Sequence, residues 1–267
     1  MHTAIKALQL KARHQVYTLL RGHNLSKLHG EGYDFSELRE YQVGDDIRKI
    51  NWTISAKLGL PYIKELHANR ELSVVVAAFI DASLYFGTGN AKQAKLTETA
   101  TVLGYAAQQN NDLFTGIQYT QEQAVSIPPT KQLYHIERFS QGLYNASLLN
   151  TSLDHRAAVE DLFKRLYRPS LLFVLSDFLE EIDLSLLSQK HEVIAVIIRD
   201  RAEESPKKLG EVTLSHPQDS QRMETYFGQR SIETYLANRK EHDEKLAEHF
   251  TRYGIRSVKI FTDDEVV

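Results

Sequence analysis

The run from Leu72 to Ile80, LSVVVAAFI, constrains the fold more than any other stretch, because it is apolar except for Ser73. An uninterrupted apolar strand of this length is typical of a parallel sheet that helices cover on both faces. Asp81 and Ser83 follow it directly. Open α/β sheets bind their ligands beyond the carboxyl ends of the strands, so this exit is the first place to look for function.

The rest of the chain alternates between predicted strands and helices. Apolar strands are expected at residues 113–119, 124–127, 171–175, 193–198 and 257–261, with a short strand at 62–66. Helices are expected at residues 3–20, 91–109, 131–144, 154–167, 184–189 and 232–253. The alternation after residue 72 predicts an α/β fold with a mostly parallel, Rossmann-like sheet flanked by helices, preceded by an N-terminal helix and an extension.

Two segments show no regular period. Residues 30–52 are crowded with aromatic residues, glycines and paired charges, and we expect an ordered irregular region there. Residues 199–210 are strongly charged, and we expect a surface loop.

Composition excludes several kinds of protein. Thirty-two basic and 35 acidic residues leave a net charge of -3, and no long basic tract is present, so a nucleic-acid partner is not expected. The absence of cysteine excludes disulfides and thiolate catalysis, and it fits a reducing compartment. Lys6, Lys11 and Arg13 interrupt the first apolar positions, so we expect neither a signal peptide nor a membrane span and predict a cytoplasmic protein.

Carboxylates and hydroxyls follow two of the predicted strands. Asp81 and Ser83 come after the first, and Ser176 and Asp177 come after the strand at 171–175, while Thr151 lies in an intervening loop. These are hard oxygen ligands of the kind that Mg²⁺ and Mn²⁺ accept. Their order resembles a von Willebrand factor A-like domain with a metal-ion-dependent adhesion site.

That resemblance implies a metal set made of Asp81, Ser83, Thr151 and Asp177. Tyr85 stands where the family's D-x-S-x-S loop has its second serine, so the implied site is degenerate and binds Mg²⁺ or Mn²⁺ weakly. No other cofactor is implied. The alternative is that Asp81 and Asp177 only cap helices and organise loops.

The segment before the first apolar strand resembles the signature of a bacterial family of unknown function, number fifty-eight in the usual series. The residues that carry the resemblance include Arg39, Glu40, Tyr41, Gly44, Asp45, Asp46, Arg48 and Trp52. The family arrangement implies an extension over residues 1–70, packed on a von Willebrand A-like domain over residues 71–267. The charged signature residues form either an ion-pair network that locks the extension in place or a docking face.

Membership of that family implies association with MoxR-type AAA+ ATPases. We therefore expect a non-enzymatic interaction module, an adaptor or partner of such an ATPase, whose protein client is unknown. Aromatic residues at the same edge, Tyr85, Phe86 and Phe178, form the expected interaction rim. The alternatives are a metal-dependent hydrolase that uses Asp81 and Asp177, and a structural scaffold without an ATPase partner.

Overall fold

A computed structural model describes residues 4–12, 34–67, 72–86, 91–215, 218 and 221–265. The chain forms two compact units, one made of residues 1–19 with 72–267 and the other of residues 20–71. The predicted division into residues 1–70 and 71–267, and the packing of the first part on the second, remain predictions.

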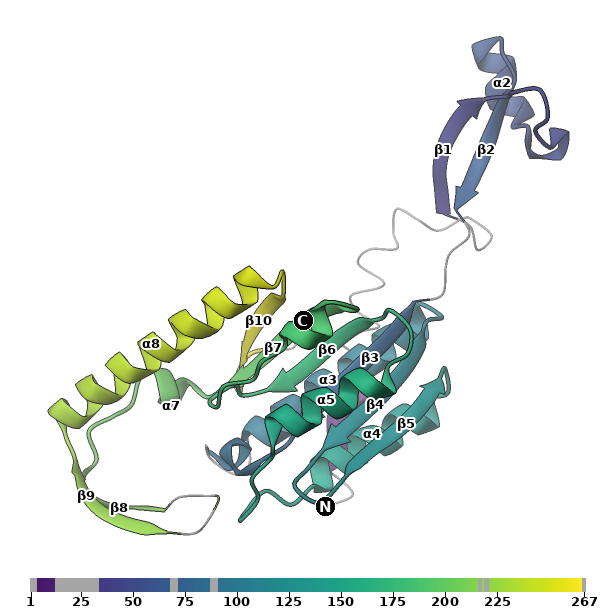
Figure 1. The fold of residues 1–267 in the computed structure, drawn as a ribbon. Helices are drawn as coiled ribbons and strands as arrows, with labels where there is room; N and C mark the ends of the chain where they lie inside the picture. The colour runs from purple at the N-terminus through teal and green to yellow at the C-terminus, as the bar shows by residue number, and fades with distance from the viewer. Residues whose placement is uncertain are drawn as a thin grey trace. The chain divides into compact units, whose positions relative to one another are not determined.

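The larger unit is built on a six-stranded sheet (Figure 1). Its strands, in spatial order, are β10 (Arg256–Phe261), β7 (Glu192–Arg199), β6 (Leu171–Ser176), β3 (Ser73–Phe79), β4 (Leu113–Tyr119) and β5 (Ala124–Thr130). All neighbouring pairs are parallel except β4 and β5. The predicted α/β class with a mostly parallel sheet is therefore confirmed.

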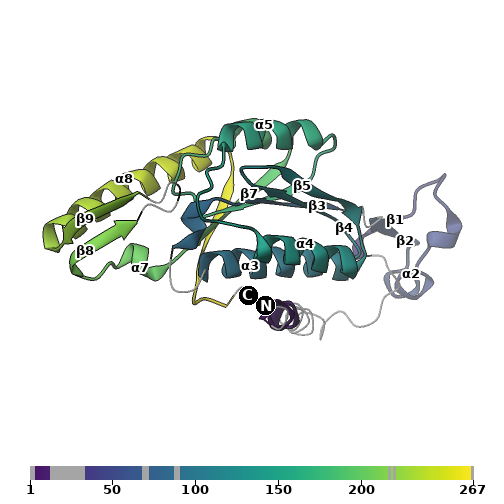
Figure 2. The ribbon, with the colours of Figure 1, turned by 90° about the horizontal axis from the view of Figure 1, so that it is seen from below.

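Helices cover both faces of this sheet (Figure 2). On one face lie α3 (Ala91–Gln109) and α4 (Leu133–Asn145), and on the other lie α5 (His155–Arg165), α6 (Ser185–Ser188) and α8 (Gln229–Arg252). Successive residues of a strand point to opposite faces, so Val75, Ala77 and Phe79 pack in the core beneath α5 and α8 while Val76 and Ala78 face α3. This is why the central strand is apolar without alternation.

A second layer covers α3. The N-terminal helix, described over residues 4–12, is joined to it by an ion pair between Lys11 and Glu98 of 2.8 Å. Gln9 donates to the carbonyl oxygen of Glu137 on α4 at 3.1 Å. The remainder of the helix predicted at residues 3–20 lies outside the described residues.

Several local predictions are wrong. The strand predicted at residues 124–127 continues through Pro128 and Pro129, because β5 is an edge strand with an unpaired outer side and its pairing with β4 is irregular between Ile127 and Thr130. Residues 199–210 are not simply a surface loop, since Arg199 is fully buried and α7 (Arg201–Glu204) follows. An antiparallel hairpin of β8 (Gly210–Ser215) and β9 (Arg222–Phe227) then leads into α8.

The described part of the smaller unit, residues 34–67, is a pair of antiparallel strands with two short helices. Its elements are β1 (Asp34–Glu40), η1 (Ile47–Lys49), α2 (Trp52–Leu58) and β2 (Tyr62–His67). The expectation of an irregular region at residues 30–52 is thus wrong for residues 34–40, where the strand is formed by pairing with β2. Asn51 caps α2 through the amide of Ile54, and Gly59 ends it in the left-handed region at φ 75°.

The signature residues make local ion pairs inside this unit. Arg39 holds Asp45 through two hydrogen bonds of 2.7 and 2.8 Å, and Arg48 pairs with Asp46 at 3.1 Å. The side chains of Arg48 and Trp52 are exposed. Some of the signature residues therefore pair locally, and the network that locks the extension in place remains a prediction.

Candidate functional site at the carboxyl edge of the sheet

Three adjacent parallel strands bring their exits to one edge. β3, β6 and β7 lie side by side, and Asp81, Asp177 and Asp200 follow their last residues closely. Asp81 and Asp177 are both buried, with 3% and 2% of their residue surface exposed. The prediction that these two acids share one edge is confirmed, and their burial means that each needs a partner.

Asp81 is held by its own loop and by a histidine. Its Oδ1 accepts hydrogen bonds from the backbone N–H of Ser83 at 2.9 Å and from the Ser83 hydroxyl. Asp81 thereby caps the start of the short helix η2 (Ala82–Tyr85). Its Oδ2 lies 3.4 Å from Nε2 of His155, the first residue of α5. The other ring nitrogen of His155 lies 3.3 Å from the carboxylate of Glu180. One buried imidazole therefore joins the β3 exit to the loop after β6.

The electrostatics of this trio favour a charged pair. Burial raises the pKa of Asp81, but the facing His155 and the hydrogen bonds from Ser83 outweigh it and hold that pKa below its ordinary value. Burial lowers the pKa of His155, but Asp81, and then Glu180 and Asp177, outweigh it and raise that pKa above its ordinary value. Asp177 is thus close enough to act on the same ring that Asp81 contacts.

Asp177 has a different partner, a buried lysine. The ammonium of Lys92, in the first turn of α3, donates to Asp177 Oδ2 at 2.8 Å and to Glu203 Oε1 at 2.7 Å. The Lys92 side chain has no exposed surface, and both carboxyl side chains are 3% exposed. The aromatic ring of Phe86 covers the same ammonium at 5.5 Å. These contacts tie α3, the β6 exit and α7 together.

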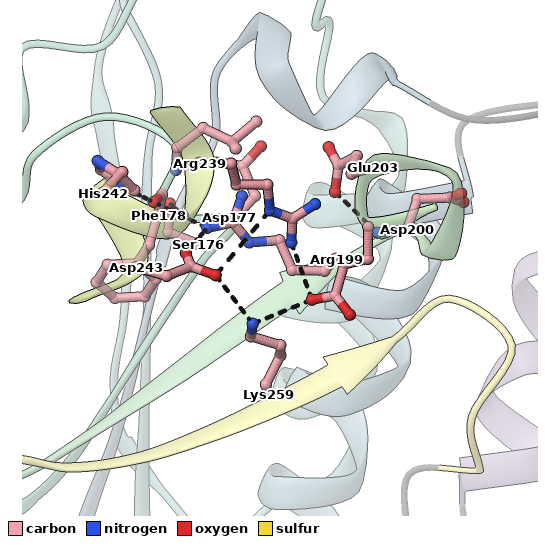
Figure 3. A network of polar contacts seen from close by, with 12 residues as sticks. Ser176, Asp177, Phe178, Arg199, Asp200, Glu203, Arg239, His242, Asp243 and Lys259 are labelled. Atoms are coloured by element: carbon pink, nitrogen blue, oxygen red, sulfur yellow. Dashed lines mark hydrogen bonds and ion pairs between the residues drawn. The ribbon is translucent and has the colours of Figure 1, made fainter. Parts of the chain in front are cut away.

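A second network lies behind Asp177, between β7, α8 and β10 (Figure 3). Arg199, fully buried, donates to the carbonyl oxygen of Phe178 at 3.3 Å and to Asp243 at 3.1 Å. Lys259 bridges Asp243 and Glu204 at 3.2 and 3.0 Å. Within the described part of the chain, Nε and Nη1 of Arg199 have no hydrogen-bond partner. The edge is therefore dense with internal charge pairs.

The predicted metal ligands are brought to this edge but are engaged elsewhere. Asp177 is bound to Lys92, Asp81 to Ser83 and His155, and the hydroxyl of Thr151 donates to the carbonyl oxygen of Leu148 at 2.6 Å. Across the described ranges, no group of three or more histidine, aspartate or glutamate side chains has an arrangement that could hold a metal ion. The residues as arranged do not fit the metal that the resemblance implies, because an ammonium already occupies the cation position beside Asp177.

The predicted aromatic rim is only partly exposed. Tyr85 and Phe86 are 43% and 46% exposed, whereas Phe178 has no exposed surface. The Phe178 ring packs edge-on against Phe250 of α8 with centroids 5.8 Å apart, so its assignment to the rim is wrong. The backbone of Phe178 is in the left-handed region at φ 49°, and its side chain is buried.

Sequence reasoning missed the cations of the site. Lys92 is not among the predicted site residues, yet in the helix predicted at residues 91–109 it precedes the buried Leu96 by one helical turn. That spacing places Lys92 on the same face of α3 as Leu96 and is the signal that could have identified it. His155 and Glu203 carry no comparable signal, because their partners come from distant segments.

The sequence profile of one family, described as "Protein of unknown function DUF58", matches residues 37–246. The chain belongs to the DUF58 family. The matched part includes the smaller unit's ion pairs and every residue of the charge clusters described above except Lys259. None of the described helices of this DUF58 chain combines the length and apolar character that crossing a membrane requires.

Relatives of this DUF58 chain occur in mycobacteria. An uncharacterized protein of Mycobacterium tuberculosis, Rv1480, and one of Mycobacterium bovis, Mb1516, are each 25% identical over 218 residues, which is 79% of this chain and 69% of theirs. Among solved structures, the conserved hypothetical protein BatB from Bacteroides thetaiotaomicron covers 71% of this chain and 90% of its own, at 11% identity and a TM-score of 0.40. That likeness is too low to carry an argument.

Proposed function

We propose that this DUF58 chain is a non-enzymatic protein-interaction module that works as an adaptor or partner of a MoxR-type AAA+ ATPase. The ATPase is suggested by the family resemblance of the signature segment. The observation that carries the choice of a binding module is that the buried acids at the carboxyl edge are matched by Lys92 and His155 of the same chain. Acids neutralised in this way are not free to hold a catalytic metal ion and activate water.

The contact surface we propose is the edge around Tyr85 and Phe86. Both aromatic side chains are nearly half exposed, directly after the loop that Asp81 organises. Aromatic side chains held by a rigid turn and surrounded by polar groups are frequent anchors of protein interfaces. Phe178 does not belong to this surface because it is buried.

The test is co-purification of the chain with the MoxR-type ATPase encoded by the same organism. The double variant Tyr85→Ala/Phe86→Ala is expected to lose at least about 90% of the captured ATPase, since removal of two anchor side chains costs an interface roughly 2–4 kcal/mol. The matched control is Tyr134→Ala/Tyr167→Ala, which removes two aromatics that are 65% and 84% exposed at other places on the unit. A thermal melt confirms folding of both.

Two results would count against the proposal. If the folded double variant still captures the ATPase at full strength, the contact does not use this edge. If the unaltered chain captures no ATPase but hydrolyses a substrate with Mn²⁺, and Asp177→Asn abolishes the turnover, the metal-dependent alternative replaces it.

A further inference from the structure

Asp177 and Glu203 form a pair of preorganised acids with one cation between them. Each carboxylate uses one oxygen to accept a backbone N–H, from Leu179 at 3.2 Å and from Asp200 at 2.9 Å. The other oxygen of each accepts from the Lys92 ammonium, at 2.8 Å for Asp177 and 2.7 Å for Glu203. These two oxygens therefore lie no more than 5.5 Å apart. The orientation of both acids is therefore set by the backbone and does not depend on the lysine alone.

The surroundings of the Lys92 ammonium favour a cation. All three side chains are buried, and an unpaired carboxylate at such depth is strongly unfavourable. The Phe86 ring at 5.5 Å offers a negative aromatic face on a further side. Two carboxylates and one aromatic face thus surround a single position that only a positive charge satisfies.

We infer that Asp177 and Glu203 form a cation site whose resident ligand is the side-chain ammonium of Lys92. The site accepts a free cation, either a primary alkylammonium or a divalent cation, only when that ammonium is removed. This inference does not depend on the proposed function, because it concerns contacts inside one unit.

The upper limit on the separation of the two oxygens allows either kind of free cation to bridge them. Truncation of Lys92 to alanine removes three methylene carbons and the nitrogen, which is the composition of n-propylammonium. A divalent cation such as Ca²⁺ binds oxygen ligands at 2.3–2.6 Å. Two ligands on opposite sides of Ca²⁺ are then about 5 Å apart, which is close to the upper limit for the distance between Asp177 Oδ2 and Glu203 Oε1.

The experiment compares thermal melts of the intact chain and of Lys92→Ala. Lys92→Ala is expected to melt lower than the unaltered chain, and n-propylammonium chloride is expected to restore stability in a saturable way. At a concentration about tenfold above Kd, the melting temperature should rise by roughly 3–6 °C. Addition of n-propanol, which has the same shape without charge, should give less than a third of that rise.

Divalent cations form the second arm. CaCl₂ and MgCl₂ are compared with NaCl at equal ionic strength, so that general screening is subtracted. Lys92→Ala should be stabilised beyond the NaCl control, whereas the intact chain and the triple variant Lys92→Ala/Asp177→Asn/Glu203→Gln should not. Mn²⁺ titrated by electron paramagnetic resonance should show a bound ion in Lys92→Ala alone.

Specific outcomes would overturn the inference. Equal rescue by n-propanol would mean that the lysine only fills space. Stabilisation of the intact chain by Ca²⁺ that Asp177→Asn abolishes would mean that the site takes a free ion beside Lys92. No response of a folded Lys92→Ala to either cation would also reject it.

A variant with a long uncharged side chain covers the case in which Lys92→Ala does not fold. Lys92→Met keeps most of the length of the side chain without its charge and leaves two buried acids unpaired. It should therefore melt lower than Lys92→Met/Asp177→Asn/Glu203→Gln, in which the acids are also neutral. The reverse order would show that the two carboxylates do not need a cation.

Discussion

His155 connects the β3 exit with the loop after β6, and replacing it by glutamine tests how much that connection stabilises the fold. A hydrogen bond to a charged group contributes about 1.5–3 kcal/mol to folding. The contact to Asp81 is an ion pair of 3.4 Å in which Nε2 of His155 makes no hydrogen bond within the described residues, so its contribution lies at or below the lower end of that range. Glu180 is 47% exposed in its side chain and adds little, because water screens the pair. We expect His155→Gln to lower the free energy of unfolding by about 1–2 kcal/mol at pH 5.5.

The effect should depend on pH in a defined direction. Because the folded-state pKa of His155 is raised above its ordinary value of 6.5, its contribution is complete below that pH and is lost as pH rises through the folded-state pKa. Because the pKa of Asp81 is lowered from 3.8, its contribution is complete above that pH and is lost as pH falls through the lowered pKa. The cluster therefore stabilises most between about pH 4 and 6.5.

The assay is urea denaturation of the intact chain and of His155→Gln at half-unit steps from pH 4.5 to 9. The difference in unfolding free energy should be greatest near pH 5.5 and approach zero at the alkaline end. Glu180→Gln serves as the control, and it should cost less than half as much at pH 5.5. A difference that is constant across this range would refute the assignment of a charged His155–Asp81 pair.

Two further predictions concern packing beside the site. Phe178→Ala should destabilise the fold by about 3–5 kcal/mol in urea denaturation, because it removes a fully buried ring that packs edge-on against Phe250; a change below about 1 kcal/mol would contradict the burial of Phe178. Gly116→Ala should cost about 1–3 kcal/mol, because a Cβ on β4 would lie 2.7 Å from the Phe139 ring of α4; an unchanged melting temperature would show that α4 shifts freely.

The central sheet was predictable because its strands are defined by local composition. The strands predicted at 113–119 and 171–175 match β4 and β6 to within one residue, and the helix at 91–109 matches α3. A strand that is buried on both faces needs apolar residues at every position, and such a run can be recognised within the segment itself. The common position of Asp81 and Asp177 then followed from parallel strand direction alone.

Elements with polar sequences were not predictable in the same way. The segment DFSELRE becomes β1 only by pairing with β2, more than twenty residues later, so nothing within it sets a strand period. The β8–β9 hairpin does carry a signal, since Val212, Met223 and Phe227 fall on one face when the strands pair. That signal becomes visible only once the register of the two strands is known.

The candidate site shows why the partner of a buried charge is harder to predict than the charge itself. Strand order establishes that Asp81 and Asp177 are buried at one edge, and their burial requires cations. Resemblance suggested a metal ion, whereas α3 supplies Lys92 to Asp177 from 85 residues away in the chain and α5 supplies His155 to Asp81 from 74 residues away. Because the internal cations match these acids, the exposed Tyr85 and Phe86 are aromatic side chains at this edge that remain available to another protein. A Tyr85 variant should therefore change binding without the loss of stability that variants of Lys92 or His155 produce, whereas a Phe86 variant also removes the ring that covers the Lys92 ammonium.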